Sequence, residues 1–255
     1  MADALNRRIR LFDALRGFAL VNMIAYHGVY DWVSVFGRPA GWFVQTDYAR
    51  GWQQAICWTF LLVAGAVFPY GRRPLRRAAL VFGCGMLLTA VTLLVMPSEQ
   101  ILFGVLHLIG ASILITALLR RILEKLPSLP AAAGCFALFL LLRGVPRGTV
   151  DFGAFCATLP RGLYRSPALF FLGFPGPGFY SADYFPILPW LFLFWTGMFF
   201  WRFLRPRAEE WLRGKRICPL LEWLGRHSLI VYLLHQPVLL AVVFLLTRLA
   251  DWGAA

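Results

Sequence analysis

Long, nearly uninterrupted runs of apolar residues restrict this chain to a membrane fold. Apolar residues make up 60% of its 255 residues and charged residues only 15%, whereas a soluble domain carries about a quarter charged residues. A helix needs roughly 20 consecutive apolar residues to cross a bilayer, and several runs reach that length. We therefore expect an all-α fold, a polytopic bundle of transmembrane helices.

The apolar runs predict about seven spanning helices. Their expected ranges are 14–35, 52–70, 78–96, 101–119, 130–143, 184–204 and 220–247. Residues 144–183, between the fifth and sixth helices, are rich in Gly, Pro and aromatic residues, and their run SPALFFLGFPGPGF is too short and too broken to cross. We expect this segment to form an outer cap on a single membrane domain, residues 1–255.

The distribution of Lys and Arg predicts an N-terminus inside and a C-terminus outside. In this orientation the inner segments hold 18 of the 25 Lys and Arg and the outer segments hold 7, as the positive-inside rule requires. Topology and attraction to anionic lipid headgroups then account for the net charge of +13. Membrane lipids are the expected partners, and nucleic acid is not, because no soluble face gathers the basic residues.

Polar side chains form a stripe along the first apolar run, FDALRGFALVNMIAYHGVYD. Arg16 and His27 are separated by three helical turns plus roughly 20°, so they share a face, with Asp13 and Asp31 one turn beyond each end. Arg16 then lies at the cytoplasmic edge, paired with Asp13 or snorkelling to the interface, or holding a ligand. His27, with Asp31 at i+4, has the pattern of an oriented base, and the alternative is a packing histidine.

The other histidines stand alone on their segments. His107 lies in FGVLHLIGAS, where Gly104 and Gly110 would let another helix approach its face closely. His235 lies in GRHSLIVYLLHQP, and His227 near the inner face. The predicted topology would bring His107 and His235 to the depth of the first-helix histidine, in the outer half of the membrane.

The sequence does not favour a metal site. The four histidines include no HxxH or HxxxH pair, and the five cysteines include no CxxC. Zinc needs three or four such ligands close together. We therefore expect no bound metal.

Four stretches resemble, in order, the bacterial members of the heparan-alpha-glucosaminide N-acetyltransferase catalytic-domain family. They are RLFDALRGFALVNMIAYHGVYD, FGVLHLIGASILI, SADYFPILPWLFLFWTG and LEWLGRHSLIVYLLHQPVL, running from residue 10 to about residue 245. The Arg16–His27 spacing also resembles the arginine–histidine signature of the membrane acyltransferase three family. The resemblance implies a multi-pass enzyme of the cell (inner) membrane. It would move an acetyl or other acyl group from cytoplasmic acyl-CoA to a sugar or amino-sugar acceptor on the outer side.

The resemblance also implies roles for the polar residues. His27 would be a general base or a transient acyl carrier, Asp31 would orient it, and His107 or His235 would hold the thioester oxygen. Asp183, at the outer mouth of the sixth helix, would touch the acceptor or only complement a helix dipole. Acetyl-CoA would be held at the inner face by charge-assisted contacts, and the residues expected there are Asp13, Arg16, Arg72, Arg73 and His227.

Two other classes of function stay open. In a small transporter or flippase the polar stripe would line a substrate or proton path. In a membrane scaffold the histidines would only pack. The oligomeric state is also open, a homo-oligomer included.

The charge distribution predicts which tags are accessible from outside the cell. Tags at the N-terminus and within GRRPLRR should be shielded in intact cells, and a C-terminal tag should be labelled by an impermeant reagent. A shielded C-terminal tag would mean an even number of spans and would contradict the predicted depths of His107 and His235.

Overall fold

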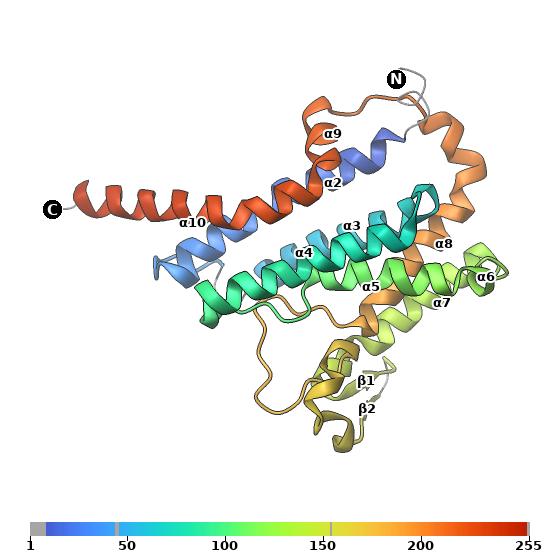
Figure 1. The fold of residues 1–255 in the computed structure, drawn as a ribbon, viewed down its shortest axis with the longest axis horizontal. Helices are drawn as coiled ribbons and strands as arrows, with labels where there is room; N and C mark the ends of the chain where they lie inside the picture. The colour runs from blue at the N-terminus through green and yellow to red at the C-terminus, as the bar shows by residue number, and fades with distance from the viewer. Residues whose placement is uncertain (1–8, 44–45, 154, 254–255) are drawn as a thin grey trace. The chain divides into compact units, whose positions relative to one another are not determined.

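The computed structural model describes residues 9–43, 46–153 and 155–253, and it is 76% helical with almost no sheet. The chain divides into two compact units (Figure 1). The terminal unit joins Met1–Phe60 to Arg207–Ala255, and the central unit is Leu61–Pro206.

The terminal unit is built on three helices from the two ends of the chain. They are α2 (Arg10–Tyr30), which continues into a π-helical turn over Asp31–Val35, α9 (Pro219–Arg226) and α10 (Ser228–Gly253). The first part of α3 (Asp47–Val67) completes the unit. Leu20 and Met23 of α2 and Ile56 of α3 form its buried core.

Glycines bring the backbones of α2 and α9 into direct contact. A Cβ atom added to Gly17 would lie 2.0 Å from the carbonyl oxygen of Leu221, and one added to Gly225 would lie 1.8 Å from that of Asp13. These pairings run in opposite directions along the two helices, so α9 is antiparallel to α2 (Figure 1). Only residues without a side chain permit such an approach, as at many helix crossings in membranes.

The chain then turns, and α10 runs parallel to α2. His27 faces His235, the α carbon of Gly28 faces Leu239, and Arg38 bonds to Asp251 at 2.5 Å. Two parallel spanning helices need an odd number of crossings between them. Four long apolar helical segments lie between α2 and α10 along the described chain. If α2 and α10 both span, we expect the short α5 to span as well, because it brings the number of crossings between them to five.

The central unit is a helical bundle that carries the cap. Its helices are the end of α3, α4 (Pro74–Val95), α5 (Val105–Leu118), α6 (Arg120–Leu123), α7 (Ser128–Leu141) and most of α8 (Ile187–Leu212). Short 3₁₀ turns lie at Phe68–Tyr70 and Pro97–Glu99. Glycines again mark the crossings, since a Cβ on Gly65 would lie 1.9 Å from the carbonyl oxygen of Phe194 and one on Gly110 would lie 2.7 Å from the amide nitrogen of Phe82.

The cap between α7 and α8 contains no α-helix in the residues that are described. It has 3₁₀ turns at Leu142–Arg147, Arg161–Tyr164 and Pro167–Leu172. Its two strands, β1 (Thr149–Asp151) and β2 (Cys156–Thr158), pair antiparallel with Val150 opposite Ala157. Glycine and proline break the apolar pattern, so the segment does not form a spanning helix.

Every range predicted to span contains a helix, and among the residues that the structure describes five helical segments are long and apolar enough to cross a membrane. These five are Asp47–Tyr70, Pro74–Val95, Ser128–Arg147, Ile187–Leu212 and Ser228–Trp252. The helix α2 has 21 residues but carries three charges in its first seven, and α5 has only 14 residues. The count of seven spans and the orientation of the termini therefore stay predictions.

The prediction of one continuous seventh helix over residues 220–247 is wrong. The helix is interrupted at His227, where α9 ends and α10 begins. The physical reason is the contact of Gly225 with the backbone of Asp13, which holds α9 along α2 in the opposite direction to α10.

The close contact of α2 with α9 predicts a stability difference between two matched variants. Gly17→Ala should lower the free energy of unfolding by about 1–3 kcal/mol, because the new methyl group must displace the α9 backbone. Gly51→Ala, on the neighbouring α3 with open space around the α carbon, should be neutral or slightly stabilising. Thermal unfolding in detergent, followed by tryptophan fluorescence, measures both, and equal midpoints would contradict the packing.

Candidate functional site

Two imidazoles from opposite ends of the chain meet in the terminal unit. The ring centroids of His27 on α2 and His235 on α10 are 5.1 Å apart. Tyr26 lies edge-on to His27 at 5.7 Å, and Tyr232 lies 5.4 Å from His235. Both histidines lie in the terminal unit, which also contains the rest of the polar stripe. We therefore take this imidazole pair as the centre of the candidate site.

A backbone carbonyl fixes the tautomer of His235. Its Nδ1 lies 2.6 Å from the carbonyl oxygen of Tyr232. A carbonyl oxygen only accepts, so a neutral His235 carries its hydrogen on Nδ1 and presents a lone pair at Nε2. Holding the thioester oxygen, the role expected from the sequence, needs an N–H donor that this tautomer does not offer. Nε2 is instead suited to accept a hydrogen.

Asp31 joins the site through a residue that the sequence analysis missed. Its side chain is 0% exposed, and its Oδ1 accepts a hydrogen bond of 2.8 Å from Nε2 of Gln236. The sequence predicted that Asp31 orients His27, whereas the hydrogen bond seen at Oδ1 reaches across to α10. Gln236 is the one amide in the apolar α10 sequence, and that isolation was the available signal.

Two of the residues that the sequence predicted to hold acetyl-CoA, Asp13 and Arg16, lie in the first two turns of α2. Arg16 is 3.6 Å from the carboxylate of Asp13, which is 3% exposed. This is the pairing that the sequence gave as one of the alternatives for Arg16. Arg7 and Arg8 lie outside the described residues.

His227 occupies the break between α9 and α10. Its Nδ1 lies 2.8 Å from the carbonyl oxygen of Trp223, and the two rings are 4.7 Å apart. The side chain is exposed. His227 therefore lies eight residues before His235 along the chain, immediately before the first residue of α10.

His107 belongs to the central unit and is almost completely buried there. It is 3% exposed, with its ring stacked on Phe103 at 5.6 Å and edge-on to Phe82 at 5.1 Å. It lines an apolar cavity of about 390 Å³ together with Phe170 and Phe171. A Cβ on Gly85 would lie 2.8 Å from its Nδ1, so this glycine makes the room for the imidazole.

The two glycines beside His107 have different neighbours. Gly110 allows the close approach of α4 that the sequence predicted, whereas Gly104 faces the carboxylate of Asp183, whose Oδ2 would lie 2.5 Å from an added Cβ. The same Oδ2 accepts a hydrogen bond of 3.1 Å from the amide of Val105. Asp183 therefore caps the start of α5, where a carboxylate also complements the helix dipole.

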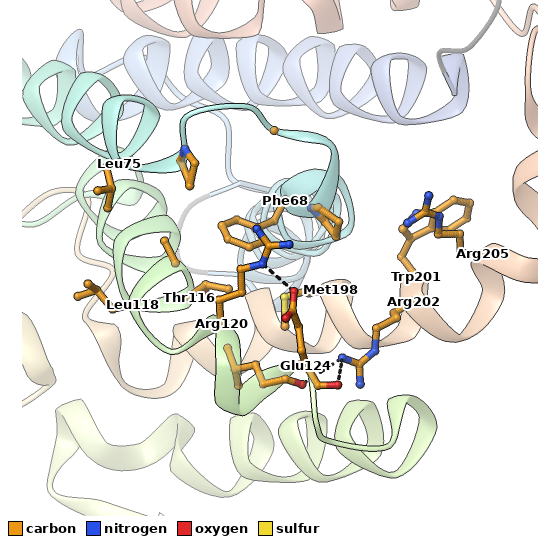
Figure 2. Close-up of a pocket in the computed structure, with 15 residues that line it drawn as sticks. Phe68, Leu75, Thr116, Leu118, Arg120, Glu124, Met198, Trp201, Arg202 and Arg205 are labelled. Atoms are coloured by element: carbon orange, nitrogen blue, oxygen red, sulfur yellow. Dashed lines mark hydrogen bonds and ion pairs between the residues drawn. The ribbon is translucent and has the colours of Figure 1, made fainter.

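A second cavity of about 520 Å³ lies in the central unit among α4, α5, α6 and α8 (Figure 2). Phe68, Thr116 and Met198 line its interior, and three arginines with one glutamate line it as well. Arg202 donates to the Leu123 carbonyl at 3.0 Å and to Ser128 at 2.8 Å. The three arginines and their acidic neighbour are Arg120, Arg202, Arg205 and Glu124.

These arginines already have partners within the protein. Arg120 pairs with Glu124 at 2.6 Å, and Arg205 stacks over the ring of Tyr70 at 5.2 Å. Arg72 and Arg73 are exposed just before Pro74, which also lines the cavity. The cavity therefore combines an apolar interior with an excess of positive charge.

The described residues contain no group of three or more His, Cys, Asp or Glu side chains that could hold a metal ion.

The long apolar helices define a helical membrane protein, and two of its histidines, His27 and His235, are in contact. The family model described as "Heparan-alpha-glucosaminide N-acetyltransferase, catalytic" matches residues 8–237, and the chain belongs to this family. Membership indicates a transmembrane acetyltransferase. No curated protein and no solved structure matches the chain.

The burial of His107 against Gly85 predicts a contrast between two alanine variants of α4. Gly85→Ala should push the imidazole from its place and lower both the unfolding midpoint and the rate of acetyl transfer. Gly83→Ala, where an added Cβ atom would have nothing within 4 Å, should change neither. Equal behaviour of the two variants, in thermal unfolding and in activity, would contradict the placement of His107.

Proposed function

We propose that this protein transfers an acetyl group from acetyl-CoA, bound from the cytoplasmic side, to a sugar or amino-sugar acceptor on the outer side of the membrane. The observation that carries the proposal is the contact of His27 with His235 inside a chain of the acetyltransferase family. Two imidazoles at this distance supply a base and a second polar contact where apolar surroundings offer few others.

The donor would bind at the positively charged inner ends of the helices. The phosphates of acetyl-CoA cannot enter hydrocarbon, but its pantetheine arm is slim and about as long as the Arg16-to-His27 separation, roughly 16 Å along a helix. Arg16 would hold the phosphates by charge-assisted hydrogen bonds. Asp13 would position Arg16 through their ion pair. Anionic lipids would contact the other basic residues of the inner face.

The reaction would proceed at the imidazole pair. The acceptor's amine or hydroxyl attacks the thioester carbonyl, its proton passes to a histidine, and the C–S bond breaks to release the thiol, which takes up a proton. His27 would act as the base or would carry the acetyl group on its imidazole between two steps. His235 would take part through the lone pair at Nε2.

The direct test is thiol release. Purified protein in lipid nanodiscs would be given acetyl-CoA and a panel of amino sugars and envelope glycans, and free thiol would be measured. Acceptor-dependent thiol release supports a transferase, whereas sugar flux across vesicles without thiol release would favour a transporter or flippase.

Arg16 and His27 are expected to affect different kinetic constants. Loss of a contact to the donor phosphates raises KM for acetyl-CoA, and a charge-assisted hydrogen bond contributes about 1.5–3 kcal/mol, or roughly ten- to a hundredfold. Arg16→Ala should therefore raise this KM with little change in kcat, and Arg16→Lys should restore only part. His27→Ala should lower kcat by about 10²–10⁴-fold with nearly unchanged donor KM.

The control is Arg50→Ala, which removes an exposed arginine that pairs with Asp47, and its kinetics should match those of the wild type. If Arg16→Ala only lowers stability and leaves the donor KM unchanged, Arg16 is a structural partner of Asp13. Near-wild-type turnover by His27→Ala would reject His27 as the reacting group.

A further inference from the structure

Two hydrogen-bond acceptors on α10 are buried without a donor among the residues that the structure describes. They are Nε2 of His235 and Oε1 of Gln236, on consecutive residues. Native proteins keep few buried polar atoms without a partner, because each one weakens the folded state, and those that persist need an explanation. Both side chains are only partly buried, although the two acceptor atoms themselves are buried.

The orientation of the Gln236 amide follows from its neighbour. Its nitrogen lies 2.8 Å from Oδ1 of Asp31. A carboxylate oxygen can only accept, so the amide must turn its NH₂ group toward Asp31 and its oxygen away from it. A purely structural link to Asp31 would account for the nitrogen and leave the buried oxygen unexplained.

His235 is held in the same way by a different acceptor. The Tyr232 carbonyl takes the hydrogen on Nδ1, so Nε2 presents a lone pair. The two neighbouring residues therefore offer two acceptors whose lone pairs have no donor among the described residues. The thioester oxygen carries no hydrogen to give, so the reacting end of the acyl donor does not suit this place.

We propose that the His235–Gln236 pair binds the nucleophilic end of the acceptor and selects a group that brings two hydrogen-bond donors. A primary amine brings two donors on one atom and fills both acceptors, whereas a group with one donor leaves one of them unsatisfied. Asp31 is then a positioning residue that keeps the Gln236 oxygen turned toward the acceptor. The inference rests on the proposed function and names the acceptor chemistry of that site.

The two ligands that test this proposal differ only at one ring carbon. Glucosamine carries an amine at C2, and 2-deoxyglucose carries no donor there. A ligand that binds the folded state raises the unfolding midpoint in proportion to its occupancy. Midpoints would be measured against the concentration of each sugar for the full-length protein in nanodiscs.

We expect glucosamine to stabilise the wild type at lower concentration than 2-deoxyglucose does. Gln236→Leu should need about tenfold more glucosamine for the same shift, as the loss of one hydrogen bond implies, and should respond to 2-deoxyglucose as the wild type does. Asp31→Asn should behave like Gln236→Leu, because asparagine can donate to the Gln236 oxygen and lets the amide turn. The matched control is Gln53→Leu, on the α3 segment of the same unit, which should respond like the wild type.

Several results would overturn the proposal. One is that glucosamine shifts the unfolding midpoint of Gln236→Leu as much as that of the wild type. The others are that the two sugars shift the midpoint of the wild type equally, or that glucosamine does not shift it at all. Asp31→Asn is isosteric and keeps the site testable if Gln236→Leu does not fold, and the comparison of the two sugars needs no variant.

Thiol release from acetyl-CoA in the same samples separates this proposal from the function on which it rests. Thiol release with a glucosamine response that does not depend on Gln236 rejects the acceptor site alone. If glucosamine stabilises the wild type more than Gln236→Leu, and the wild type never releases thiol, the transferase function alone is rejected.

Discussion

Asp31 and Gln236 form a buried hydrogen bond between side chains 205 residues apart, and the arrangement of the terminal unit depends on it. A carboxylate that is 0% exposed in an apolar helix pair has no water to solvate it, so it requires a donor from another part of the chain. Gln236 supplies that donor only when α10 lies parallel to α2. The same alignment places His235 against His27, so one polar contact sets the geometry of the imidazole pair.

Backbone contacts at glycines support this arrangement from the other end of α2. Gly17 and Gly225 let α9 touch α2 directly, and the chain must then reverse at His227 to begin α10. Close glycine contacts and a few buried polar pairs are the interactions expected to hold helices together where lipid removes the hydrophobic driving force. The same kinds of contact occur in the central unit. Gly65 and Gly110 lie at its helix crossings, and Asp183 accepts a hydrogen bond from the start of α5.

The sequence allowed the helices to be predicted because each one is a local pattern. The apolar runs placed α4 and α7 to within a few residues, whereas α8 extends eight residues beyond its predicted end at residue 204. The four matching stretches indicated the family, which the family model confirms. Partners across helices were harder to predict. Asp31 was assigned to His27 because i+4 neighbours are visible in one helix, whereas Gln236 could be found only from the packing of α10. The break at His227 likewise depends on a contact between Gly225 and Asp13.

The central claim is that acetyl transfer takes place at the imidazole pair, and the most direct measurement is the rate of thiol release by His235→Ala at saturating acetyl-CoA. His235 would hold the nucleophile at its Nε2 beside His27, and misplacing a reacting group costs on the order of 10²-fold in rate. We therefore expect the variant to lose at least a hundredfold in kcat while it binds acetyl-CoA as the wild type does. A folded His235→Ala protein that releases thiol at close to the wild-type rate would contradict the assignment of the chemistry to this pair.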